Sequence, residues 1–89
     1  MTWRVDFSKD SLKFLAANHL FKDQVLDLVK KAILKFRGEA ININIKKLKG
    51  PWAGFYRISK GDLRVIVEFN FDEFFVYIEV IDWRGGVYK

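Results

Sequence analysis

The sequence predicts an α+β fold with an N-terminal strand and a helical hairpin that packs on one face of a twisted antiparallel β-sheet. Three patterns lead to this prediction: apolar and polar residues alternate over 3–7, apolar residues recur every three or four positions over 20–37, and alternation returns after residue 55. Short-linked strands that follow two helices are typical of the α+β class. A length of 89 residues suits a single domain over residues 1–89.

The first strand and the first helix follow from local signals. The stretch WRVDF at 3–7 alternates strictly, which predicts a short, half-buried strand. Ser8 stands where a helix N-cap is favoured, and Asp10 suits the first turn of a helix. We therefore expect a short helix from Ser8 to about Ala17.

The second helix has the clearest pattern in the chain. Apolar residues recur at helical spacing from Leu20 to Arg37, and Gly38 follows as a candidate C-cap. Residues 39–53 combine alternating isoleucines with the only proline and nearby glycines, and are predicted to form an ordered loop. Three strands are then predicted at 55–59, 62–70 and 74–82, joined by hairpin connections.

Alternation sorts the predicted strands into a core face and an uncovered face. The expected core residues are Tyr56, Ile58, Leu63, Val65, Val67, Phe69, Phe74, Val76, Ile78 and Val80, with Ile81 on the other side. Arg57 and Arg64 are thereby expected on the uncovered face, with Tyr77 nearby. Guanidinium groups fit phosphate, and an aromatic ring can stack on a base. Ordinary solvent-facing charges, paired with Glu68 and Glu79, fit the same pattern.

Net positive charge is concentrated in one segment. Lys plus Arg number 16 and Asp plus Glu number 11, which gives a formal net charge of +5. Residues 46–64 hold six basic residues and one acid, Asp62, so this segment alone accounts for the excess. A local positive potential attracts polyanions such as nucleic acid. A lysine-rich solvent loop has the same composition, so charge alone leaves both interpretations open.

Several protein classes are disfavoured by the composition. There is no cysteine, and therefore no disulfide, thiol nucleophile or thiolate metal site. Arg4 and Asp6 stand where a signal peptide needs its apolar stretch, and no apolar run approaches the roughly 20 residues of a membrane span. We therefore expect a cytoplasmic protein.

Motifs in the second half of the chain give a more specific indication. They are KLKG at 47–50, YRISKGDLRVIVEF at 56–69 and WRGGVY at 83–88. In these motifs, and in the order of its predicted elements, the chain resembles the RelE/ParE superfamily of bacterial type II toxin–antitoxin toxins. The resemblance implies a RelE-like, microbial ribonuclease-like fold and a cognate antitoxin as partner in a toxin–antitoxin hetero-oligomer. Because the superfamily includes both mRNA endonucleases and DNA gyrase inhibitors, the resemblance leaves the activity open.

The RelE branch implies a ribosome-dependent mRNA endonuclease, or mRNA interferase, that uses no metal or cofactor. In that reaction a ribose 2′-OH attacks the adjacent phosphate of mRNA in the ribosomal A site, so the ribosome and mRNA are further implied partners. The catalytic residues carried over from the motifs are Arg57, Arg64, Arg84 and Tyr88. The resemblance implies phosphate binding by the arginines, leaving-group contact by Arg84 and base stacking by Tyr88.

Four lysines are expected to contact mRNA or ribosomal RNA: Lys46, Lys47, Lys49 and Lys60. Ser59 stands where RelE carries a second lysine, which leaves the general base open among Lys47, Lys49 and Lys60. His19, the only histidine, is interpreted as a turn residue. The alternative functions are a ParE-like, non-enzymatic gyrase inhibitor and a decayed toxin that retains only antitoxin binding.

Overall fold

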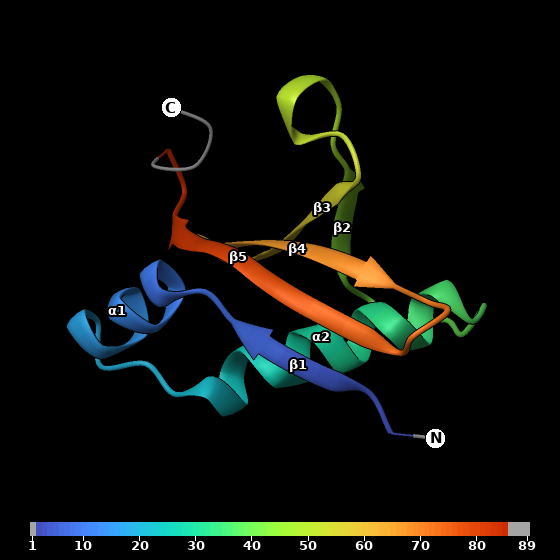
Figure 1. Ribbon diagram of the computed structural model, residues 1–89, viewed down its shortest axis with the longest axis horizontal. Helices are drawn as coiled ribbons and strands as arrows, with labels where there is room; N and C mark the ends of the chain where they lie inside the picture. Colours follow the sequence, from blue (N-terminus) through green and yellow to red (C-terminus); the bar gives the residue numbers. More distant parts are fainter. Residues whose placement is uncertain (1, 86–89) are drawn as a thin grey trace.

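Two helices cover one face of a five-stranded sheet (Figure 1). The structure is a computed structural model that describes residues 2–85. Its elements in chain order are β1 (Arg4–Phe7), α1 (Lys9–Ala17), α2 (Lys22–Phe36), β2 (Asn44–Lys47), the 3₁₀ turn η1 (Gly50–Trp52), β3 (Phe55–Lys60), β4 (Leu63–Asn70) and β5 (Phe75–Trp83). The predicted α+β class is confirmed. Neither helix in this part of the chain is long and apolar enough to cross a membrane.

The sheet is mixed rather than purely antiparallel. Its order is β1-β5-β4-β3-β2, with β1 parallel to β5 and all other neighbours antiparallel. Short connections force β3, β4 and β5 into antiparallel hairpins. In the sequence both helices lie between β1 and the other strands, so no hairpin fixes the direction of β1. The predicted antiparallel sheet is formed by β2 to β5, and β1 adds a parallel strand at its edge.

Ser8 attaches the start of α1 to the sheet. Its Oγ accepts a hydrogen bond from the backbone N–H of Ser11 at 3.1 Å and donates to the carbonyl of Glu79 on β5 at 2.8 Å. The predicted N-cap is thus confirmed. The long amphipathic helix is confirmed as α2, and its buried residues are Val25, Leu28, Val29, Ala32 and Ile33.

Residues 39–53, predicted as an ordered loop, contain an edge strand. Over residues 44–47, β2 pairs antiparallel with β3. Ile43 and Leu48 are buried beside it, as expected for side chains that dock this segment on the core. The alternation of the isoleucines indicated this strand correctly. Pro51 lies beyond the strand, in η1, and does not interrupt the hydrogen bonds between β2 and β3.

A β-bulge at Glu79 reverses the orientation of the end of β5. Ile66 pairs with Val80 and Val67 pairs with Ile78, which leaves Glu79 as an extra residue. The end of β5 therefore differs from the predicted alternation: Ile81 is 4% exposed and joins the core cluster, whereas Val80 pairs on the opposite face. One inserted residue moves every following side chain to the other face of the sheet.

The bulge predicts unequal effects for two neighbouring truncations. Ile81→Ala removes buried core atoms and is expected to lower the free energy of unfolding by about 2 kcal/mol. Val80→Ala, on the half-buried opposite face, is expected to lower it by less than about 1 kcal/mol. Urea denaturation of both variants measures the difference. Equal losses, or a larger loss for Val80→Ala, contradict the bulge.

Candidate nucleic-acid interface

We call the side of the sheet opposite α1 and α2 the open face (Figure 1). Residues that pair directly across neighbouring strands point to the same face, so the strand register defines its rows. The central row, from β2 to β5, is Lys46, Arg57, Ile66 and Val80. The row nearer the β3–β4 turn is Asn44, Ser59, Arg64 and Asp82, and the row on the other side contains Phe55, Glu68 and Tyr77.

Arg57 occupies the middle of the open face. It is half-buried on β3, directly opposite Lys46 on β2 and Ile66 on β4. Directly opposed side chains have Cβ atoms about 5 Å apart, so two cations lie next to each other on paired strands. Neighbouring cations on a restrained backbone are well suited to bind a phosphate group.

Arg64 is held at the β3–β4 turn. Its Nη1 donates to the carbonyl of Gly61 at 2.7 Å and to that of Leu63 at 3.0 Å. A guanidinium carries five N–H donors, and these bonds use a single nitrogen. They therefore do not engage the Nε–Nη2 edge, which can bind a phosphate bidentately.

Arg84 reaches the same end of the sheet. Its backbone N–H donates to the carbonyl of Asp62, in the β3–β4 turn, at 2.6 Å. The structure thus brings Arg64 and Arg84 together around one turn, with Arg57 one row away. Tyr88, the fourth predicted catalytic residue, lies outside the described residues.

Two of the predicted RNA-contacting lysines lie on the helix side of the sheet instead. Lys47 pairs with Tyr56 and Lys60 pairs with Leu63, residues that pack against the core. A hydrogen bond from Lys31 lowers the pKa of Asp27 on α2, and the charge of Lys60 adds to this effect. The positive charge of Lys60 is therefore felt at α2, on the opposite side of the sheet from Arg57.

The other two predicted lysines are nearer the open face. Lys46 lies on it, beside Arg57. Lys49 lies in the β2–β3 loop, immediately before η1. Of the four predicted RNA contacts, Lys46 is the one that the strand register places in a row with a catalytic candidate.

The open face also carries a carboxylate that sequence reasoning treated only as an ion-pair partner. Glu68 is exposed on β4, between Phe55 and Tyr77 and one row from Arg57. The position of Glu68 on this face could have been predicted from the sequence, because Arg64 and Glu68 are four residues apart on one strand and therefore share a face. A carboxylate in this position can accept a proton, and the two flanking rings offer surfaces for base stacking.

Histidine lies elsewhere in the fold. His19 is in the turn between α1 and α2, with a φ of 55°, on the helix side of the molecule. Within residues 2–85, no group of three or more His, Cys, Asp or Glu side chains is placed to hold a metal ion. The open face presents guanidinium, ammonium, carboxylate and aromatic groups.

Comparison with solved structures identifies the class of this fold, although no protein-family model and no curated protein matches the sequence. A point mutant of YafQ from E. coli aligns with a TM-score of 0.70 over 99% of this chain and 100% of that chain, at 14% identity. A chain of the archaeal RelE–RelB complex from Pyrococcus horikoshii gives 0.62 over 98% and 100%, at 28% identity. A chain of the RelB–RelE antitoxin–toxin complex from Methanococcus jannaschii gives 0.61 over 92% and 93%, at 22% identity.

The chain has the fold of RelE-like toxins. The alignments cover nearly all of this chain and nearly all of each neighbour. The predicted resemblance is confirmed, since these structural neighbours are RelE- and YafQ-type toxins of toxin–antitoxin systems. A shared fold does not determine activity, which has to be argued from the residues of the open face.

Proposed function

We propose that this chain is the toxin of a type II toxin–antitoxin pair and that it cleaves mRNA on the ribosome. The observation that carries the proposal is the grouping of Arg57 and Arg64 on one open sheet face, with Arg84 at its end. The RelE- and YafQ-like fold supports the toxin role. A sheet face that combines cations with aromatic rings suits single-stranded RNA, whose bases are available for stacking.

The proposed reaction is a transesterification within the RNA chain. The 2′-oxygen of a ribose forms a bond to the adjacent phosphorus, and the bond from that phosphorus to the 5′-oxygen of the next nucleotide breaks. The products are a 2′,3′-cyclic phosphate and a free 5′-hydroxyl. Negative charge builds on the non-bridging oxygens, where Arg57 and Arg64 bind, while Arg84 contacts the phosphate or the leaving group. The departing 5′-oxygen takes a proton from solvent water and becomes the 5′-hydroxyl.

Glu68 takes up the proton of the attacking hydroxyl in this proposal. A carboxylate is deprotonated at neutral pH, whereas a lysine or an arginine must first lose its own proton. Glu68 lies one row from Arg57 on the open face, whereas Lys47 and Lys60 lie on the helix side. The position of Lys47 and Lys60 on the helix side argues against either of them as the general base, which the sequence left open among three lysines.

In this proposal the positive charge of the open face binds both the ribosome and an antitoxin. Lys46 extends the central row of the open face to the edge strand, where a longer polyanion can reach it. An acidic antitoxin segment laid over this face would block the phosphate site. Such an association is expected to be fast and to slow as salt is added.

Ser59 favours a second candidate function. It lies in the same row as Arg64, at the position where RelE carries a second lysine. With one cation fewer, the face suits binding without cleavage, as in a ParE-like gyrase inhibitor or a decayed toxin that retains only antitoxin binding.

Expression of the chain in bacteria separates these functions. The nuclease proposal predicts growth arrest with a rapid fall in incorporation of labelled amino acids, because mRNA is cut during translation. DNA supercoiling is expected to stay normal over the same period. Continued protein synthesis with loss of supercoiling supports the gyrase inhibitor instead, and normal growth with both processes intact supports the decayed toxin.

A further inference from the structure

The open face continues for one row beyond Glu68. Arg4 of β1 pairs with Phe75 of β5, and Phe75 pairs with Asn70 at the end of β4, so these three residues form a fourth row. Asn70 is two residues after Glu68 on one strand, which puts the fourth row on the same face as the other three. The open face therefore extends from the β3–β4 turn to the turn that joins β4 to β5.

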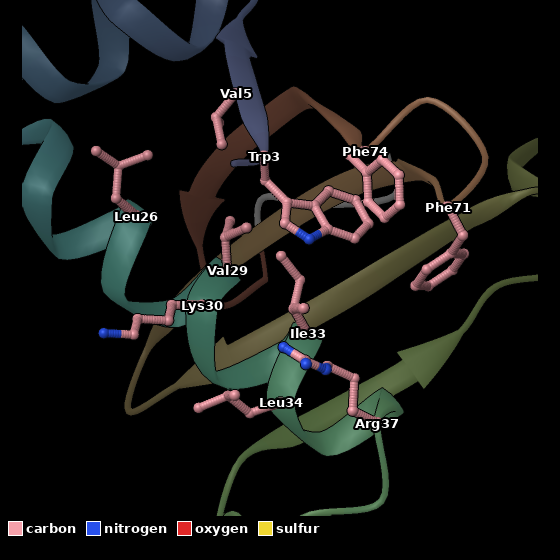
Figure 2. Close-up of a pocket in the computed structure, with 10 residues that line it drawn as sticks. All are labelled: Trp3, Val5, Leu26, Val29, Lys30, Ile33, Leu34, Arg37, Phe71 and Phe74. Atoms are coloured by element: carbon pink, nitrogen blue, oxygen red, sulfur yellow. The ribbon is translucent and has the colours of Figure 1, made fainter. Parts of the chain in front are cut away.

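Aromatic contacts on the helix side support the fourth row. Figure 2 shows Trp3 and Phe74 at an apolar pocket between β1, α2 and the β4–β5 turn. Trp3 packs edge-on against Phe74 and Phe71, with ring centroids 5.5 Å and 5.7 Å apart. Arg4 and Phe75 follow Trp3 and Phe74 directly in the sequence and lie on the opposite face. The fourth row is therefore backed by packed side chains, which is favourable for a binding site.

A small polar pocket lies at the fourth row. It is lined by Arg4, Asn70 and Phe75, together with Glu73 from the β4–β5 turn. Its volume is about 190 Å³. Pockets for drug-sized ligands measure roughly 300–1,000 Å³, so this one suits a single planar ring system rather than a whole nucleotide.

Arg4 and Phe75 give this pocket a stacking surface. The guanidinium carbon of Arg4 lies over the Phe75 ring, 4.7 Å from its centroid, and the Arg4 side chain is 74% exposed. Arg4 Nη2 also lies 3.6 Å from Oδ2 of Asp6, which partly offsets its positive charge. Bases of single-stranded RNA stack on aromatic rings and on guanidinium planes, so the pocket suits a base better than a phosphate.

The polar groups of the pocket have a defined pattern of hydrogen-bond donors and acceptors. The backbone N–H of Glu73 donates to Oδ1 of Asn70 at 2.9 Å, and this bond orients the amide, whose NH₂ group is a donor. The Glu73 side chain is exposed and, as a carboxylate, can only accept hydrogen bonds. The pocket thus combines one carboxylate acceptor with donors from Asn70 and Arg4.

Guanine is the RNA base that matches this pattern. Its Watson–Crick edge carries two adjacent N–H donors, at N1 and N2, which one carboxylate accepts in parallel. Its O6 and N7 are acceptors for the amide and guanidinium donors. Adenine, cytosine and uracil each place an acceptor beside the N–H donor of this edge, and that acceptor would face the second carboxylate oxygen of Glu73.

We propose that this pocket binds a guanine base of the RNA on the 5′ side of the cut. The side follows from the proposed reaction, because the nucleotide whose 2′-hydroxyl faces Glu68 precedes the scissile phosphate. The fourth row lies beyond Glu68, on the far side from Arg84 and the leaving group. Arg57 and Phe75 are two rows apart, about 13 Å along the strands, and two strands apart, about 10 Å across the sheet. The position of the base rests on the proposed function, whereas recognition of guanine rests on the pocket alone.

Mononucleotides test the pocket without the ribosome. Guanosine and adenosine 5′-monophosphate carry the same phosphate, so a difference between them reports the base. Titrated into the ¹⁵N-labelled full chain, guanosine monophosphate should give saturable shifts at the side-chain NH₂ of Asn70, at Nε–H of Arg4 and along residues 70–75. Adenosine monophosphate should bind there at least about tenfold more weakly. Equal binding by the two nucleotides, or shifts confined to other surfaces, overturns the proposal.

Matched variants test the two parts of the pocket. Glu73→Gln replaces the carboxylate with an amide, which can pair bidentately with adenine, and should remove the preference for guanosine monophosphate. Glu39→Gln changes an exposed glutamate after α2 and should keep that preference. Arg4→Gln should weaken binding at least about fivefold through lost stacking, whereas Lys22→Gln, which removes a cation over another phenylalanine ring, should not. Retention of the preference by Glu73→Gln contradicts the site.

Cleavage on the ribosome separates this inference from the proposed function. Stalled complexes that carry guanine or another base at each nucleotide 5′ of the cut are compared by initial rate. The wild-type chain should cut at least about tenfold faster with guanine at one of these positions, and Glu73→Gln should lose that difference. If the wild-type chain cuts no mRNA, the proposed function fails while the titration still decides guanine recognition. Equal cutting of all the mRNAs, together with selective binding of guanosine monophosphate, assigns the pocket to a free guanine nucleotide and overturns the proposal for RNA.

Discussion

Arg64→Ala is expected to slow cleavage of ribosome-bound mRNA by about 10²–10³-fold, the usual effect of removing one donor to a developing oxyanion. Arg64 lies on β4, which is paired on both sides, and its Nη1 is held by the carbonyls of Gly61 and Leu63. A group fixed in this way needs little reorganisation as charge develops on the phosphate. Primer extension on a stalled ribosomal complex measures the rate.

The hydrogen bonds of Arg64 call for a folding control. Arg64→Ala removes two bonds to the β3–β4 turn, each worth about 0.5–1.5 kcal/mol, so thermal unfolding by circular dichroism accompanies the rate measurement. Arg64→Lys should retain ribosome binding and remain slow, since lysine keeps the charge and loses the bidentate fork. Lys46→Ala should only weaken ribosome binding and its salt dependence. Cleavage at the wild-type rate by folded Arg64→Ala contradicts the assignment.

Glu68→Gln is expected to slow the same cleavage by about 10²–10⁴-fold, the usual contribution of a general base. The amide keeps the size of the side chain and cannot take up the proton of the 2′-hydroxyl. Because the substitution also removes a negative charge from the open face, affinity for the ribosome should be unchanged or higher. A large fall in kcat with an unchanged or lower KM is therefore the expected signature.

A matched control accompanies the substitution at position 68. Glu39→Gln, which changes an exposed glutamate after α2, should cleave normally. A wild-type rate of cleavage in Glu68→Gln shows that another group takes the proton.

Much of this fold could be predicted because its signals are local. Ser8 caps α1 as its position indicates, and the spacing of apolar residues in α2 matches its buried face. The face shared by Arg57 and Arg64 also follows from simple alternation along β3 and β4, which run without interruption. Local periodicity is sufficient wherever the backbone stays regular.

The failures arise where a contact between distant segments overrides local pattern. The bulge at Glu79 depends on how β5 pairs with β4, and it moves Ile81 into the core. The segment before Pro51 becomes β2 because β3 provides a partner strand. The turn bonds of Arg64 have no signature in the sequence. The apolar pocket is also invisible there, because it joins β1, α2 and the β4–β5 turn.

Cleavage in a purified system tests the central claim most directly. Ribosomes stalled on a defined mRNA with an empty A site are incubated with the wild-type chain, and the mRNA is examined by primer extension and by analysis of its new ends. The account predicts a cut within the A-site codon that leaves a 2′,3′-cyclic phosphate and a 5′-hydroxyl, and a cut slowed at least about 10²-fold in Arg57→Ala and Arg64→Ala. Intact mRNA with the wild-type chain, together with inhibition of purified DNA gyrase, would contradict it.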